Sequence, residues 1–165
     1  MTDTPELTPD AVVSLREITA ETLFPIIKLS ETLTETQRHM VAPNAVSIAE
    51  AHFSPYAWFR AIYADETPVG FLMLHIGPED DTKPAEEQPV VHFLWRLMVG
   101  GAYQGKGFGR RALELLMDRL RGEGVTRLAV SCHPGDDGPE GFYRRLGFER
   151  DGKWYDDEVG MSRGL

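Results

Sequence analysis

One stretch of the sequence decides the fold: Phe93-Leu94-Trp95-Arg96-Leu97-Met98-Val99, then Gly100-Gly101, then the turn Gln104-Gly105-Lys106-Gly107-Phe108-Gly109. Beyond the turn, apolar residues recur at helical spacing, at Ala112, Leu113, Leu116, Met117 and Leu120. The sequence therefore predicts a strand, a glycine-rich turn and a helix over residues 93–122.

The turn is suited to binding an anion. Glycines before a helix let the backbone turn tightly, and the free N–H groups and dipole of the helix end favour negative charge. Lys106, Arg110 and Arg111 crowd this positive end, where each cation costs roughly 0.3–1 kcal/mol with nothing bound. A bound phosphate group reverses that cost. The same residues also fit an ordinary helix start whose basic side chains bend into solvent.

Two phosphate-binding patterns fit these residues incompletely. Gly100, followed by Gly105-Lys106, imitates a nucleoside triphosphate loop, but Gly107 stands where a Ser or Thr hydroxyl should meet magnesium. The run Gly107-x-Gly109-x-x-Ala112 fits a dinucleotide site, which needs an acidic residue at the end of the next strand. That strand ends Ser131-Cys132-His133, so a dinucleotide oxidoreductase lacks its ribose carboxylate.

The chain as a whole reads as one soluble domain over residues 1–165. Its hydrophobic content of 42% and charged content of 26% are ordinary for a globular protein. Cys132 is the only cysteine, which excludes an intrachain disulfide and favours a reducing, cytoplasmic setting. The first residues do not resemble a signal peptide and no apolar run has membrane-spanning length, so we expect no membrane association.

Charge and histidine spacing limit the partners. The net charge of −9, from 17 basic and 26 acidic residues, repels nucleic acid and attracts cations, polyamines included. None of the five histidines stands at metal-ligand spacing, so no metal is expected.

The remaining elements follow from periodicity and turn residues. Residues 1–10 predict a loose tail, residues 12–18 a strand, and Thr19 to about Leu29 a helix that Pro25 starts late or kinks. Ser47 and Glu50 fit a capping box at the start of a second helix. Two strands, 58–64 and 69–75, form a hairpin, and residues 77–89 form an acidic surface loop.

The C-terminal part predicts a strand at 126–132, a helix from Pro139 to a stop at Gly147, and strands at 148–154 and 158–162. The element order is thus β, α, α, β, β, β, α, β, α, β, β.

Two motifs in this order resemble a known superfamily. The turn Gln104-x-x-Gly107-x-Gly109 is similar, without a departure, to the coenzyme A turn of the GNAT N-acetyltransferases, and Phe142-Tyr143-x-x-Leu146-Gly147-Phe148 resembles their second signature. The resemblance implies an α/β fold (α+β by some schemes), with a mixed, mostly antiparallel sheet of about seven strands flanked by about four helices. It also implies a homodimer, by analogy.

A narrower resemblance points to the diamine and spermidine/spermine N-acetyltransferase branch. It rests on Ser14-Leu15-Arg16-Glu17-Ile18, Val41-Ala42-Pro43-Asn44 and Trp95-Arg96-Leu97-Met98. The implied reaction is direct attack of a small-molecule amine, diamine or polyamine preferred, on the thioester of acetyl-CoA.

The resemblance also implies the residues that hold acetyl-CoA. By this resemblance, the pyrophosphate binds to backbone N–H groups of the turn and of the first helical residue: Gln104, Gly105, Lys106, Gly107, Phe108, Gly109 and Arg110. The resemblance also implies that the pantetheine arm binds along the edge of the strand at Leu97, Met98 and Val99, and that Arg145 contacts the cofactor. Asp136 stands where many relatives have a cofactor-binding Asn, so it either accepts a hydrogen bond or caps the next helix.

By the same resemblance, Tyr143 is the general acid. A phenol with a pKa near 10 donates to a departing thiolate near 8.5, uphill by roughly 2 kcal/mol but coupled to loss of the acyl group. An isolated helix tyrosine would instead be core. Trp95 occupies the place where many relatives carry a carboxylate base, so we expect deprotonation through water, relayed by His92 or a carboxylate from the early helices.

The acceptor pocket is open to interpretation. Glu31 and Glu35 share one face if their segment is helical, either as solvated surface or as a site for a cation. Trp95, with Trp58 and Tyr63, forms either an apolar wall for methylene groups or plain core. A non-catalytic acyl-CoA-binding module is the main alternative function, favoured by the missing carboxylate and opposed by Tyr143.

Overall fold

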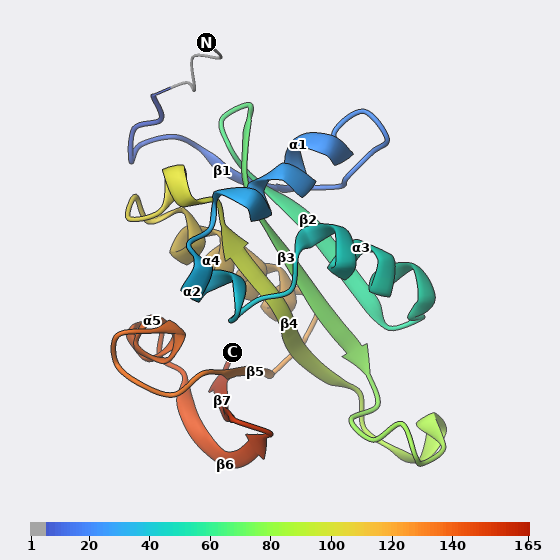
Figure 1. Ribbon diagram of the computed structural model, residues 1–165. Coiled ribbons are helices and arrows are strands. Elements are labelled where there is room, and N and C mark those ends of the chain that lie inside the picture. Colours follow the sequence, from blue (N-terminus) through green and yellow to red (C-terminus); the bar gives the residue numbers. More distant parts are fainter. Residues whose placement is uncertain (1–5) are drawn as a thin grey trace.

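A single seven-stranded sheet organises the computed structural model, which describes residues 6–165 (Figure 1). The strands are β1 (Val13–Arg16), β2 (Ala57–Ala64), β3 (Thr67–Gly77), β4 (Val91–Val99), β5 (Arg127–Cys132), β6 (Glu149–Tyr155) and β7 (Glu158–Gly164). They lie in the order β1-β2-β3-β4-β5-β7-β6. All neighbours are antiparallel except β4 and β5, which are parallel. The predicted mixed, mostly antiparallel sheet is confirmed.

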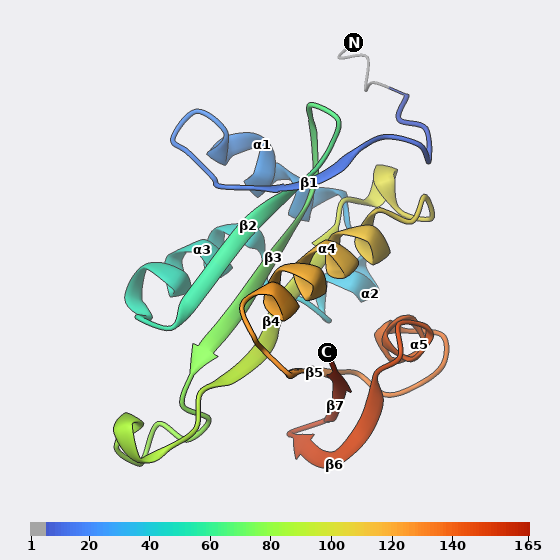
Figure 2. The same ribbon diagram turned by 180° about the vertical axis from the view of Figure 1, so that it is seen from behind.

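Helices cover both faces of the sheet. They are α1 (Leu23–Lys28), α2 (Glu35–Arg38), α3 (Asn44–Phe53), α4 (Phe108–Gly122) and α5 (Pro139–Arg145), with short 3-10 turns at Leu29–Thr32, Ala85–Glu87 and Gly101–Tyr103. Figures 1 and 2 show α1 and α3 on one face and α4 on the other. Among the described residues, no helix is both long and apolar enough to cross a bilayer.

Two apolar cores lie on the two faces because the central strand alternates. On β3, Leu72 and Leu74 point into the core beneath α4, whereas Phe71 and Met73 point into the core beneath α1 and α3. The core under α4 contains the helical positions expected from the sequence: Ala112, Leu113, Leu116, Met117 and Leu120. Burial on both faces fixes the register of the sheet at its centre.

The sheet opens between β4 and β5. These strands pair at only two positions, Phe93 with Ala129 and Leu94 with Val130. Opposite β3, Leu94 faces Leu74 and Arg96 faces Met73, so Trp95 is the extra residue of a β-bulge. A bulge bends its strand and ends regular pairing. The rest of β4 therefore leaves β5, and the edge from Leu97 to Val99 borders a gap.

The capping box expected at Ser47 and Glu50 is wrong. Ser47 lies inside α3, fully buried, with a hydroxyl that has no hydrogen-bond partner among the described residues. The capping box stands instead before α2, where Thr34 Oγ1 accepts from Gln37 N at 3.2 Å and Gln37 Oε1 accepts from Thr34 N at 3.0 Å. Both quartets match the motif, but only Thr34 precedes a helix.

Two expectations for the N-terminal part can be compared with the structure. Residues 1–5 of the predicted loose tail lie outside the described residues, but Leu7 is only 8% exposed and packs in the core beneath α4. Leu7 therefore contacts the core, whereas its neighbours Glu6, Thr8, Pro9 and Asp10 are exposed. The first helix starts late, at Leu23, which places Pro25 in the first turn where its missing N–H costs nothing.

Glu140 is a buried carboxylate that joins α5 to its surroundings. Its oxygens accept two bonds from Arg150 at 2.9 Å, one from Arg144 at 2.5 Å and one from the Gly135 backbone N–H at 3.1 Å. The hydrogen bond from Arg150 is the main reason that the pKa of Glu140 is lowered, against the opposing effect of burial. The Glu140 side chain thereby connects the loop before α5 to strand β6 through hydrogen bonds.

We expect Glu140→Gln to lower the melting temperature at pH 7, because two guanidinium groups and an N–H lose their charged acceptor. A lowered pKa means that this stabilisation is complete above the usual value of 4.5 and is lost as the pH falls through the folded-state pKa. Thermal melts of wild type and variant should therefore converge in acid. Asp136→Asn, at the exposed partner of Arg144, is the control, and an equal loss in both variants at pH 7 would contradict the assignment.

Candidate active site

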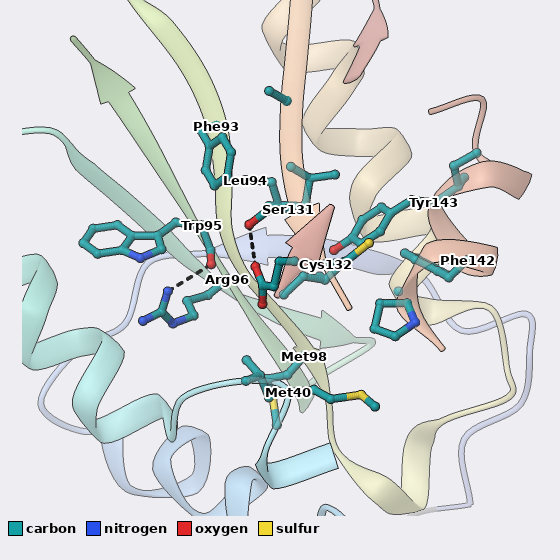
Figure 3. A pocket seen from close by; sticks show the side chains of 18 of the residues that line it. Met40, Phe93, Leu94, Trp95, Arg96, Met98, Ser131, Cys132, Phe142 and Tyr143 are labelled. Carbon is teal, nitrogen blue, oxygen red and sulfur yellow. Dashed lines mark hydrogen bonds between the residues drawn. The ribbon is translucent and has the colours of Figure 1, made fainter. Parts of the chain in front are cut away.

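A large groove follows the gap between β4 and β5. Its volume is about 1920 Å³, and it runs from the start of α4, past α5, to the turn between β6 and β7. Figure 3 shows side chains from β4, β5 and α5 converging on it. The groove contains most of the residues expected to hold the cofactor: Leu97, Met98, Val99, Gln104, Gly105, Gly107, Phe108, Gly109, Arg110 and Arg145.

The glycine turn presents free backbone donors. Gly105 and Gly107 have φ angles of +77° and +82°, and an added Cβ would meet no atom within 4 Å, so conformation rather than space requires glycine there. Gly107 is the N-cap of α4 and no side chain caps this end. The first intrahelical acceptor is Gly107 O, which receives Arg111 N at 3.1 Å. The preceding N–H groups are therefore oriented to bind an anion.

Gln104 lines the groove and also holds the glycine turn in position. Its Nε2 donates to Val99 O at 2.9 Å, and its Oε1 accepts from Gln37 Nε2 at 2.9 Å. The side chain thus joins the end of β4 to α2. Gly109 allows a similarly close approach, because a Cβ there would lie 3.3 Å from Val99 Cγ2. The start of α4 is held tightly against the edge of β4.

The three cations expected at the start of α4 have different roles. Arg111 turns away and donates to Ala11 O at 2.7 Å, which makes it a structural residue. Arg110 pairs with Glu114 at 2.9 Å. Lys106, and Arg145 on α5, have no carboxylate partner among residues 6–165. Arg145 lines the groove, whereas Lys106 does not but lies between Gly105 and Gly107, which do.

Asp136 does not cap the following helix. Helix α5 begins after Gly138 with no side-chain cap, and the Asp136 side chain is 87% exposed and 3.4 Å from Arg144. It does not line the groove. The capping interpretation is therefore wrong, and the loop is instead held by Glu140.

Tyr143 lies deep in the gap. It is 6% exposed and packs edge-on against Phe142 and Phe148, with ring centroids 5.2 and 5.5 Å away. Figure 3 shows its hydroxyl directed toward Cys132. Burial raises the pKa of Tyr143, and the nearby Cys132 and Glu158 raise it further, so the phenol is protonated at neutral pH. The arrangement offers one buried proton donor beside the open edge of β4.

The residues that were expected to bind the acceptor amine do not lie together in the structure. Glu31 lies in the 3-10 turn Leu29–Thr32, whereas Glu35 begins α2, so they do not share a helix face as anticipated. Neither lines the groove. Trp95 does line it, with the Arg96 guanidinium carbon 5.3 Å from its ring centroid. Arg96 in turn pairs with Glu50 at 3.2 Å.

His92, considered above as a relay, lines the groove near the other end of β4. Burial lowers the pKa of His92, and Glu123 at the end of α4 opposes that shift. Trp58 packs against the core beneath α4 and does not line the groove. Tyr63 belongs to the other core. Of the three aromatic residues considered for the acceptor wall, only Trp95 lines the groove.

One group in the groove was missed by sequence reasoning. Ser131 Oγ donates to Glu158 Oε2 at 2.6 Å, and His133 Nε2 is 3.8 Å from Glu158 Oε1. No motif joins these residues. They meet because β5 and β7 pair with Ser131 opposite Gly160, which places Glu158 on the same face of the sheet. Among residues 6–165, no three His, Cys, Asp or Glu side chains converge as metal ligands.

Comparisons with known proteins agree with this geometry. The model of the acetyltransferase (GNAT) family matches residues 18–148. L-2,4-diaminobutyric acid acetyltransferase of Streptomyces avermitilis is 32% identical over 103 residues, which cover 62% of this chain and 52% of that protein. Serotonin N-acetyltransferase 2, chloroplastic, of Oryza sativa subsp. japonica is 41% identical over 58 residues, 35% of this chain and 28% of that protein. The chain thus matches about half, or less, of the length of these relatives.

Solved structures share the fold. An acetyltransferase from Thermus thermophilus superposes with a TM-score of 0.73 at 19% identity, covering 93% of this chain and 97% of that one. PaiA N-acetyltransferase from Thermoplasma acidophilum, in complex with coenzyme A, gives 0.66 at 17% identity, covering 93% and 99%. The GNAT-like fold expected from the sequence is confirmed.

We expect Gly107→Ala to weaken coenzyme A binding, measured by calorimetry, about tenfold or more, because the strained turn misdirects donors to a charged group. Gly152→Ala is the matched control: its φ is +84°, its Cβ position is also open, and it does not line the groove. Both variants should lose about 1–2 kcal/mol of stability from left-handed strain. If the two variants bound coenzyme A equally well, the turn would not be part of the coenzyme A site.

Proposed function

The chain belongs to the acetyltransferase (GNAT) family, which uses acetyl-CoA as its acyl donor, and we propose that it transfers the acetyl group to a primary amine of a small molecule. One observation carries the proposal. The uncapped glycine turn, the open edge of β4 and the buried Tyr143 all border a single groove. These are the parts needed to hold a thioester and to protonate its leaving sulfur.

The turn and the strand edge fit the two ends of acetyl-CoA. The N–H groups of Phe108, Gly109 and Arg110 would hold the pyrophosphate, with Lys106 and Arg145 adding charge. The edge of β4 from Leu97 to Val99 would hold the pantetheine arm, since parallel pairing with β5 ends at Leu94. Asp136, which does not line the groove, is a weaker candidate than these residues.

The gap favours proton donation by Tyr143. The acceptor nitrogen attacks the thioester carbonyl carbon, and the hydroxyl protonates the departing sulfur. Burial raises the pKa of Tyr143, which alone would make donation harder. Burial in the same gap also raises the pKa of the Cys132 thiol, to about 11. A sulfur arriving there becomes more basic as well, so the match between donor and acceptor is preserved.

A diamine or polyamine is the acceptor that we favour. The net charge of −9 attracts polycations, and the Streptomyces relative is named for an amino acid with two amino groups. Glu31 and Glu35 do not line the groove and so do not support this preference. A homodimer, a cytoplasmic location, and the absence of nucleic-acid or membrane partners remain predictions made by analogy and composition.

A non-catalytic acyl-CoA-binding module is the second candidate. The observation that favours it is Trp95, which occupies the bulge on β4 where many relatives carry a carboxylate. Such a protein would bind acetyl-CoA and respond to it without transferring the acetyl group.

Release of free thiol from acetyl-CoA separates the two candidates. We expect turnover with 1,4-diaminobutane, spermidine or 2,4-diaminobutyrate, the last by analogy with the Streptomyces relative. Slower turnover is expected with lysine and an amino-terminal peptide, which carry less net positive charge than 1,4-diaminobutane and spermidine. No turnover with any amine, while acetyl-CoA still raises the melting temperature, would favour the binding module.

We expect Tyr143→Phe to lower kcat by about 10²-fold, the usual contribution of a general acid, with little change in acetyl-CoA affinity. Timed thiol-release assays and calorimetry measure the two quantities. Tyr56→Phe, at a tyrosine outside the groove, is the matched control. Unchanged kcat in Tyr143→Phe would mean that this tyrosine only fills the core.

A further inference from the structure

Glu158 differs from the other carboxylates that are withdrawn from solvent. Among residues 6–165, six carboxylates are buried or half-buried: Glu50, Asp80, Glu114, Glu140, Asp151 and Glu158. The first five each pair with an Arg or Lys, namely Arg96, Lys83, Arg110, Arg144 with Arg150, and Arg127. Glu158 has neither. A half-buried carboxylate without a cation costs stability unless a ligand supplies one.

The side chain of Glu158 is held in place but keeps one oxygen available. It is 29% exposed, and Ser131 Oγ donates to its Oε2 at 2.6 Å. Oε1 lies 3.8 Å from His133 Nε2, too far for a hydrogen bond. Both Ser131 and Glu158 line the groove. The fixed carboxylate therefore presents a free acceptor oxygen to whatever enters.

Glu158 also lies near the proposed acid. Its charge is one of the causes that raise the pKa of Tyr143. The two groups come from different elements, α5 and β7, and flank the gap where β4 and β5 separate. An ammonium bound at Glu158 would thus stand close to a thioester whose sulfur faces Tyr143.

We propose that the carboxylate of Glu158 binds the ammonium group of the acceptor and takes its proton, supplying from β7 the base that β4 lacks. The proposal rests on the amine acetyltransferase function. It replaces the expected relay through His92 or an early helix with a residue on the last strand. Ser131 is a positioning residue for this carboxylate.

The proton and electron changes balance. The ammonium gives one proton to Glu158, and the freed lone pair forms the C–N bond with the thioester carbonyl carbon. The C–S bond breaks with its electron pair on sulfur, which takes the proton of Tyr143. The nitrogen loses its second proton to the phenolate, and Glu158 releases its proton to solvent beside half-exposed His133. Each transfer thus yields one amide, one thiol and one proton.

The surrounding walls favour an alkyl ammonium. Met40, Phe93 and Trp95 line the groove and are labelled in Figure 3. The nearest cation on β4, Arg96, is neutralised by Glu50. Methylene groups would pack on the apolar side chains while the ammonium meets Glu158. A chain of methylenes between two amines fits both features.

Replacement of one oxygen tests the base directly. Glu158→Gln keeps an acceptor for Ser131 and removes the charge, and we expect kcat/KM for 1,4-diaminobutane at pH 7 to fall about 10²-fold. Asp157→Asn is the matched control, because Asp157 is the neighbouring residue, 81% exposed and 3.7 Å from His133. That control should keep its activity within about twofold, as expected for an exposed charge.

The pH profile separates a base from a structural role. The groups that face Glu158 are Ser131, Cys132 and His133 of β5 and its end, Asp157 of the adjoining turn and Tyr143 of α5. If Glu158 takes the proton, the deficit of Glu158→Gln should shrink as the pH rises toward the amine pKa, because the free amine needs no base. A constant deficit at all pH values, or activity equal to wild type, would overturn the proposal.

Binding measurements keep this result separate from the proposed function. Thermal shift with acetyl-CoA should be the same for wild type and Glu158→Gln, which shows that the variant folds. Calorimetric titration of 1,4-diaminobutane into the coenzyme A complex should show weaker binding by Glu158→Gln than by wild type and Asp157→Asn. That difference, without turnover, would support the ammonium site while refuting the acetyltransferase function. Equal binding by all three proteins would overturn the site.

Discussion

The β-bulge at Trp95 is the constraint on which the site depends. One extra residue on β4 ends its pairing with β5 after Leu94, in the middle of an otherwise continuous seven-stranded sheet. A regular parallel pair would close the gap with backbone hydrogen bonds and leave no room for a ligand. Because β4 bends away, its edge borders a groove, the glycine turn follows directly at its end, and Tyr143 reaches the opening from the other side.

Strands β1 to β4 are consequently joined to β5, β7 and β6 more by side-chain packing than by backbone hydrogen bonds. The junction has two pairs of facing residues, and the core beneath α4 holds it together, where Leu94 and Phe108 meet Leu128 and Val130. Arg111 adds a tie from α4 to Ala11 ahead of β1. Glu140 performs the equivalent task at α5 and β6. Core packing and these side-chain hydrogen bonds thus support the walls of the groove.

Local sequence patterns predicted the helices and strands, but not the contacts between residues that are far apart in the chain. The strands, the hairpin and α4 were found because period and turn residues are encoded within each segment. The capping box was misplaced because Ser47 and Thr34 match the same motif, and only the structure shows that Thr34 precedes a helix whereas Ser47 is buried inside one. Glu31 and Glu35 were grouped on a helix that ends between them. Glu158 could not be found, since only the register of β5 and β7 brings it to Ser131.

Two glutamates show how hydrogen-bond partners separate structural from functional carboxylates. Glu140 is fully buried and its oxygens are saturated by two arginines and a backbone N–H, so its charge serves to hold α5 and β6. Glu158 has one hydroxyl donor and an open groove before it. A carboxylate on β4 would share a strand with the pantetheine edge. Placed on β7, it stands across the groove from that edge, so the amine enters between base and thioester.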